Sequence, residues 1–136
     1  MVPKFRAFLK STKDLREVLV IDYLNRMVDL EGGEIEQYFE DIVLMQSTGL
    51  KDKNGVEIFE GDVVRYTWDM PSDVNATEKG KKVRISKVFW SDWRASWAVG
   101  KKSCNNDLFR YARNGNTVEV IGNIYTNPEL LSSGIE

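Results

Sequence analysis

Short apolar runs separated by turn residues follow one another along this chain, and helical periodicity is almost absent. Residues 5–9, 18–21 and 27–30 are three such runs, and the polar turns between them predict an antiparallel meander. The segment 35–39 fits both a helical turn and a strand, and we predict a strand. The first part of the chain is therefore expected to form a small β-sheet.

The stretch 44–64 contains the highest density of turn-forming residues between two apolar segments. An Asn-Gly pair at 54–55 predicts a two-residue hairpin turn, because primed turns need φ > 0 at both central positions, where Asn and Gly cost least. The Glu-Gly-Asp sequence at 60–62 predicts a second turn, in which the Asp62 side chain caps backbone N–H groups. The strands expected on either side of this stretch cover residues 41–46 and 63–68.

The pattern from residue 69 onward predicts a loop followed by a hairpin. The loop covers 69–80, and alternating apolar residues over 82–90 and 93–99 predict two strands that turn at residues 91–92. In this hairpin we expect Trp93 to be exposed. The two other tryptophans of the hairpin, Trp90 and Trp97, are expected to be buried.

The last part of the chain combines turns with one more strand. A polar loop is predicted over 100–107, and an Asn-Gly pair at 114–115 marks a tight turn. Residues 117–125 predict a closing strand with a bulge or bend at Gly122. An Asn-Pro-Glu sequence at 127–129 has the form of a helix start, because Asn is a favoured N-cap and Pro fits the first helical position.

This count of about nine short strands predicts an all-β, β-rich fold with one minor short helix. A chain of 136 residues can bury a stable core without further covalent links. We expect a small N-terminal antiparallel meander over residues 1–46, and a small SH3-like or similar β-barrel with a short terminal helix over 47–131. Residues 132–136 are expected to form a frayed tail.

Cysteine content and hydropathy point to the cellular compartment. Cys104 is the single cysteine, so no disulfide forms within one chain, and a reducing compartment explains this most simply. No apolar run approaches the ~18 residues that a membrane span requires, and the first six residues lack the apolar core of a signal peptide. We expect a soluble cytoplasmic protein that does not bind membranes.

The sequence contains no histidine, which is the commonest general base near neutral pH and the commonest metal ligand. Phosphate-binding glycine loops are also missing. We therefore expect no enzymatic activity, no catalytic or metal-binding residues and no cofactor. One alternative is a carboxylate- or metal-dependent hydrolase, because four carboxylates lie close together and oxygen ligands suit Mg²⁺ or Ca²⁺. These residues are Glu34, Glu36, Glu40 and Asp41, and a solvated acidic edge is the simpler interpretation.

Charge is distributed unevenly, although the net charge of the chain is only −2. Residues 14–41 contain nine acids against two bases, a net charge of −7, and residues 79–113 contain ten bases against two acids, a net charge of +8. This polarity favours either a basic face for nucleic acid or another anionic partner, or complementary faces of a homo-oligomer. Solvated faces of a monomer are the third interpretation.

The basic segment also carries most of the tryptophans. Aromatic faces that stack on bases, next to cations that follow phosphates, are how many proteins bind single-stranded nucleic acid. Core packing of the tryptophans is the alternative. The candidate macromolecule-binding residues are Trp93, Lys79, Lys81, Lys82, Arg84 and Arg94.

Three segments together resemble the YopX family of phage and prophage proteins. They are KFRA at residues 4–7, LMQSTGLKDKNGVEIFEGDVV at 44–64 and VEVIGNIYTNPELL at 118–131. The resemblance implies a β-rich product of phages and prophages of Gram-positive bacteria that acts in the host cytoplasm, and it implies no catalytic residues. Turn formers, strand residues and a helix cap make up these segments, so they indicate architecture.

The main functional hypothesis is thus a non-enzymatic binding or adaptor module that engages a host or phage macromolecule, either protein or nucleic acid. A single-stranded nucleic-acid-binding protein with a basic, Trp-rich face is a more specific alternative. A structural component or assembly factor of the virion is a further one.

Overall fold

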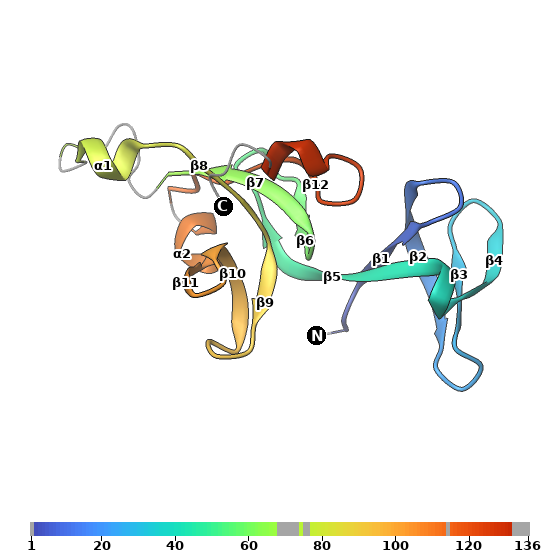
Figure 1. The fold of residues 1–136 in the computed structure, drawn as a ribbon. Helices are drawn as coiled ribbons and strands as arrows, with labels where there is room; N and C mark the ends of the chain where they lie inside the picture. The colour runs from blue at the N-terminus through green and yellow to red at the C-terminus, as the bar shows by residue number, and fades with distance from the viewer. Residues whose placement is uncertain (1, 68–73, 75–76, 114, 132–136) are drawn as a thin grey trace. The chain divides into compact units, whose positions relative to one another are not determined.

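The computed structural model describes residues 2–67, 74, 77–113 and 115–131, and of residues 79–80 only the backbone. Within them the chain is built of antiparallel strands and a few short helices, which confirms the predicted all-β class. The chain divides into two compact units, unit 1 over Met1–Ser47 and unit 2 over Thr48–Glu136. Figure 1 shows the elements of both units.

Unit 1 is an antiparallel sheet that contains the predicted meander. Its strands follow the order β4-β3-β2-β1-β5. A small core forms where Ala7, Leu9, Val28, Leu30 and Ile42 pack together. The elements are β1 (Phe5–Leu9), β2 (Asp14–Asp22), β3 (Met27–Leu30), β4 (Glu34–Tyr38), the 3-10 helix η1 (Phe39–Asp41) and β5 (Ile42–Lys51), which continues into unit 2.

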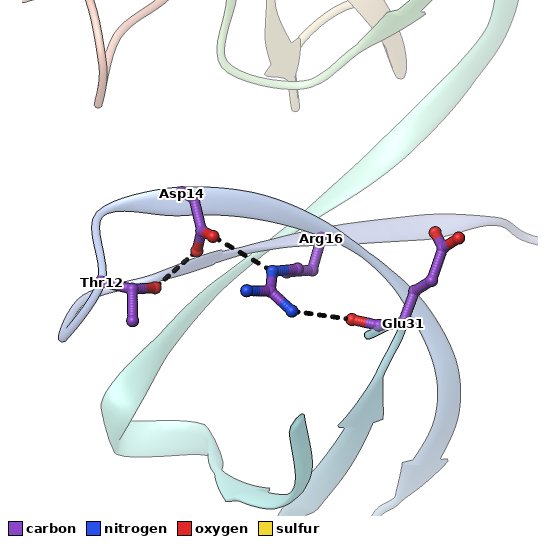
Figure 2. A network of polar contacts seen from close by, with 4 residues as sticks. All are labelled: Thr12, Asp14, Arg16 and Glu31. Carbon is purple, nitrogen blue, oxygen red and sulfur yellow. Dashed lines mark hydrogen bonds and ion pairs between the residues drawn. The ribbon is translucent and has the colours of Figure 1, made fainter. Parts of the chain in front are cut away.

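A polar network ties the turn between β1 and β2 to the end of β3 (Figure 2). The Asp14 carboxylate accepts from the Thr12 hydroxyl and lies 3.1 Å from Nε of Arg16, while Nη1 of Arg16 donates to the carbonyl of Glu31 at 3.1 Å. The Thr12 hydrogen bond, supported by Arg16, holds the pKa of Asp14 below its usual value. A Cβ at Gly32 would collide with the Arg16 guanidinium, and Gly32 also has φ +91°. Glycine is therefore required there.

The β2–β3 tip, residues 23–26, closes the hairpin between the paired residues Asp22 and Met27. Asp22 Oδ1 accepts from the backbone N–H of Asn25 at 3.0 Å, and its Oδ2 accepts from the Asn25 amide at 2.8 Å. Arg26 closes the turn with φ +57°. The turn leaves Leu24 90% exposed.

Unit 2 contains two three-stranded antiparallel sheets, in the orders β12-β7-β8 and β11-β10-β9, and β6 pairs with β5. Within the described residues these strands are not assigned to one closed barrel. The elements are β6 (Glu57–Phe59), β7 (Asp62–Tyr66), α1 (Glu78–Lys81), β8 (Arg84–Lys87), β9 (Phe89–Ser91), β10 (Ser96–Lys101), β11 (Cys104–Asp107), α2 (Leu108–Ala112), β12 (Glu119–Asn123) and the 3-10 helix η2 (Pro128–Leu131). The core consists of Ile58, Val64, Tyr66, Val88, Val99, Leu108, Tyr111 and Val118.

The turn between β5 and β6 differs from the predicted two-residue turn. Gly55 has φ +83°, but Asn54 is not in the left-handed region that a primed turn requires. Instead the buried Asp52 carboxylate accepts from the N–H groups of Asn54 and Val56, both at 2.9 Å, and from that of Val120 at 2.9 Å. One carboxylate thus fixes a longer loop and joins it to β12.

The turn at Asp62 has the form that the sequence predicts. Asp62 is buried, and its Oδ2 accepts from the backbone N–H of Phe59 at 2.8 Å. Its carbonyl accepts from the N–H of Val88 at 2.8 Å. The side chain therefore acts as a turn cap, as expected.

The alternating segment 82–90 is not one strand. It breaks at Val88, so that β8 pairs with β7 while β9 pairs with β10 in the other sheet. Val88 is buried between them and bonds to the Gly61-Asp62 turn. The alternation weakens here, because Lys87 falls on the apolar side and Val88 on the other, but the pattern does not show that the backbone of Val88 leaves the ladder.

The prediction of a polar loop over 100–107 needs correction. The expected polar loop contains β11, which returns after a tight turn at 102–103, and the next segment forms the helix α2. Asp107 caps this helix by accepting from the N–H of Phe109 at 3.1 Å. Polar residues on β11 concealed the strand from sequence analysis.

The C-terminal part of the described chain contains the predicted bulge and short helix, but Oδ1 of Asn127 accepts from the backbone N–H of Asn123 at 3.3 Å and not from η2. A register shift between Val120 and Gly122 is the predicted bulge. A Cβ at Gly122 would lie 2.6 Å from Oδ1 of Asn127 and 2.8 Å from a methyl of Leu130, so η2 packs directly on this glycine. The predicted tail 132–136, Trp68, Asn114 and most of the predicted loop 69–80 lie outside the described residues, and the last residues of that loop begin α1.

Candidate functional site

The candidate site is centred on the β9–β10 tip, residues 92–95, which joins the paired residues Ser91 and Ser96. The N–H of Ala95 donates to the carbonyl of Ser91 at 2.8 Å, and the N–H of Arg94 donates to its hydroxyl at 3.3 Å. Ala95 has φ +55°. The predicted turn at 91–92 is thus a longer turn at 92–95, because a left-handed alanine gives no turn signal in the sequence.

Trp93 is 86% exposed, as the sequence predicts. The guanidinium of Arg94 lies over its ring, with 5.4 Å between the guanidinium carbon and the ring centroid. Asn105 on β11 holds that guanidinium: its Oδ1 accepts from Nε of Arg94, and its carbonyl accepts from Nη2 at 2.6 Å. The tip therefore presents an indole and a fixed cation side by side.

A second tryptophan on the same sheet is open to solvent. Trp90 is 46% exposed, so the prediction that it is buried was wrong. It pairs across the strands with the partly buried Trp97, and their rings meet edge to face at 5.2 Å. Trp97 packs against the core while Trp90 lies outside it. Because residues paired across two strands share one face of the sheet, the alternating pattern could not show that only Trp97 of this pair reaches the core.

A hollow of about 590 Å³ lies beside the tip. Its charged lining residues are Asp92, Arg94 and Lys102, and Lys101 is exposed on the neighbouring strand. Cys104 also lines the hollow and is an exposed free thiol. The hollow is therefore aromatic on one side and net positive.

The six predicted binding residues are only partly brought together. Trp93 and Arg94 lie at the tip, whereas Lys81 and Lys82 are exposed at the end of α1, which Figure 1 shows away from the β9–β10 hairpin. The side chain of Lys79 lies outside the described residues. Sequence analysis missed Trp90, Lys102 and Asn105. The pairing of β10 with β11, which places the last two beside the tip, gave no signal in the sequence.

Arg84 lies beside the core of unit 2 and not at the β9–β10 tip. It is half-buried on β8 opposite Tyr66. Burial, together with the neighbouring Tyr111, raises the pKa of Tyr66 to about 12, and burial also raises the pKa of Tyr111, while Arg84 opposes both shifts. The two rings lie 4.8 Å apart. Arg84 is thus a neighbour of the core tyrosine pair.

The carboxylates of the hydrolase alternative lie in unit 1. Glu34 and Glu36 are on β4, and Glu40 and Asp41 are in η1. Glu36, Glu40 and Asp41 are exposed, and Glu40 lies 3.9 Å from Nε of Arg26. In the part of the chain that the structure describes, no three acidic or thiol side chains are grouped so as to hold a metal ion. Nor does any helix among these residues have the length and apolar character for crossing a membrane.

Fold and site together define an all-β protein of two small units with an exposed aromatic hairpin. A family model described as YopX protein matches residues 4–132, and the chain belongs to that family, which confirms the resemblance seen in the sequence. Among solved structures, the chain is similar to the crystal structure of protein EF1440 from Enterococcus faecalis, with 30% sequence identity and a TM-score of 0.63. The match covers 96% of this chain and 99% of that one. No curated protein matches.

Proposed function

We propose that this protein is a non-enzymatic binding or adaptor module that engages a macromolecule of a phage or of its bacterial host in the cytoplasm. The β9–β10 tip is its contact surface. A single observation carries the proposal: Trp93 is 86% exposed on a turn that backbone and side-chain hydrogen bonds hold in place. Tryptophan and arginine are the residues that most often dominate binding energy in interfaces.

The arrangement around Trp93 supports a role in binding. Asn105 already orders the Arg94 guanidinium, so a partner that uses this cation loses little side-chain entropy. Trp90 extends the aromatic surface along the same sheet. The sequence without histidine supports the non-enzymatic part of the proposal, because the commonest general base is missing.

Affinity capture from a lysate of phage-infected host cells tests the proposal, with the wild-type protein, a Trp93→Ala variant and a Leu24→Ala control. Both changed side chains are almost fully exposed at hairpin tips, so neither variant should lose stability. We expect Trp93→Ala to lose a partner that wild type and Leu24→Ala retain. Equal capture by all three proteins contradicts the assignment of the tip, and turnover of any substrate by the purified protein contradicts the non-enzymatic role.

A further inference from the structure

We infer that the ligand of the β9–β10 tip is a single-stranded nucleic acid, an inference that rests on the proposed function. The tip combines the two elements that such ligands require, namely aromatic faces for unpaired bases and cations for the phosphates between them. Both elements lie in one three-stranded sheet, β11-β10-β9.

Trp93 provides the stacking face. With 86% of its surface in solvent, its indole remains accessible even though the Arg94 guanidinium covers part of one side. Trp90 lies on β9 just before the tip, and its half-exposed ring offers further aromatic surface. Its edge-to-face contact with Trp97 fixes its orientation. A base stacked on Trp93 would therefore lie at a hollow that Trp90 also lines.

Cations surround this surface on the side of the hollow. Arg94 and Lys102 line it and Lys101 is exposed next to Lys102, while Asp92 is the acidic residue of the lining. The whole chain has a net charge of −2, so attraction of a polyanion depends on this local excess of positive charge. Two or three phosphate contacts are what these side chains can supply.

A single strand fits better than a duplex because bases in a duplex are stacked on each other and offer no free face to an indole. Recognition by stacking is also tolerant of sequence, since every base has a π face. We therefore expect weak sequence preference and a clear preference for unpaired strands.

Fluorescence anisotropy with a labelled oligothymidylate of about 16 nucleotides, a single-stranded RNA of equal length and a matched DNA duplex tests this inference. We expect both single strands to bind more tightly than the duplex at about 50 mM salt. Two or three phosphate contacts predict binding that is roughly 7- to 18-fold weaker at about 200 mM salt. A Lys102→Gln variant should lower the slope of log Kd against log salt by about 0.7.

The stacking contribution is measured with three variants. Trp93→Ala should bind the single strand roughly 5- to 150-fold more weakly, and Trp93→Phe should stay within a few-fold of wild type because it keeps an aromatic face. Leu24→Ala should bind like wild type, since it changes an equally exposed tip residue in the acidic segment.

Several results overturn the inference: no binding at low salt, binding without salt dependence, equal affinity for the duplex, or unchanged affinity of Trp93→Ala. Capture from lysate separates this failure from failure of the proposed function. If a protein partner depends on Trp93 and survives nuclease treatment, the nucleic-acid inference falls while the binding module stands. If Trp93→Ala changes neither assay, both fall.

Discussion

The β2–β3 tip of unit 1 and the β9–β10 tip of unit 2 are built on the same turn. Each turn has four residues between the last paired residue of one strand and the first paired residue of the next. Each ends in a non-glycine residue in the left-handed region, Arg26 at φ +57° and Ala95 at φ +55°. The last residue of the first strand, Asp22 or Ser91, accepts from the backbone N–H three residues later. The two turns thus share a side-chain cap and a left-handed last residue.

The second turn position holds a large exposed apolar residue in both tips, Leu24 at 90% and Trp93 at 86% exposure. Their surroundings differ. The first tip lies in the segment with a charge of −7, and the second lies in the segment with a charge of +8. At the first tip the arginine of the turn covers Phe39, whereas at the second it covers the exposed Trp93 itself.

This difference shows that turn geometry alone does not make a binding site. The first tip also exposes an aromatic ring, since Tyr23 is 72% exposed beside Leu24. Of the two tips, the second alone combines its exposed ring with a guanidinium that Asn105 holds and with a lysine that lines the same hollow. The comparison also supplies matched controls, because a change at one tip has a structural equivalent at the other.

The largest effect is expected when the two exposed residues exchange places. A double variant, Trp93→Leu with Leu24→Trp, keeps the composition and both turns but moves the indole into the acidic segment. We expect it to lose single-strand binding as Trp93→Ala does, roughly 5- to 150-fold, measured by anisotropy. Wild-type affinity in the exchanged protein would show that the charge around the tip is irrelevant.

A smaller loss is expected from Asn105→Ala, which removes the acceptor that fixes Nε of Arg94. Nη2 keeps its bond to the Asn105 carbonyl, so the guanidinium is only partly released, and affinity should fall about 2-fold. Asn106→Ala on the same strand is the control. In an Arg94→Ala background, Asn105→Ala should have no further effect on affinity. A loss that persists there would contradict a role through Arg94 and point to the other bond of this side chain, which Nδ2 donates to the Lys102 carbonyl at 3.1 Å.

Ser91→Ala tests how the second tip is held. The Ser91 side chain is buried, and its hydroxyl accepts from the N–H of Arg94 at 3.3 Å. Its loss should lower the free energy of unfolding by about 1 kcal/mol, measured by urea denaturation. Ser96→Ala, the residue paired with it, should stay within about 0.5 kcal/mol of wild type. Equal effects of the two changes would argue against this hydrogen bond.

The smallest effect concerns pH and separates the two turns. Hydrogen bonds from Asn25 hold the pKa of Asp22 below its usual value of 3.8. A carboxyl group with a lowered pKa stabilises the folded tip fully above its unfolded value, and this contribution is lost as the pH falls through the lowered pKa. Protection of the Asn25 amide in hydrogen exchange, corrected for intrinsic rates, should therefore fall in acid. Protection of the Arg94 amide, whose acceptor is a hydroxyl, should not follow the same curve.

Local signals in the sequence were sufficient for much of the fold. The predicted run at 5–9 is β1 and that at 27–30 is β3, because β-branched and aromatic residues between turn formers leave few other structures. The bulge at Gly122 and the cap at Asp62 were also correct, since each depends on the chemistry of one residue and its neighbours. The exposure of Trp93 followed from its place beside a turn.

The rest depended on contacts between distant residues. The Asp52 carboxylate reaches the N–H of Val120, and this bond helps to replace the two-residue turn that Asn54-Gly55 predicted. The break at Val88 and the helix α2 likewise follow from packing on other strands, which outweighs a local pattern. The prediction for Trp90 failed because only its pair partner Trp97 packs against the core, which local alternation does not show.

By itself, then, the amino-acid sequence determined the all-β class, the charge asymmetry and the exposed indole, because these follow from composition and from residues close together in the chain. Only the tertiary structure decided which cations stand beside that indole. Arg94 is fixed by Asn105, and Lys102 joins them because β11 folds back onto β10, whereas Lys81, Lys82 and Arg84 lie elsewhere although they share the same basic segment. The physical reason is that strand pairing, not distance along the chain, sets which side chains meet.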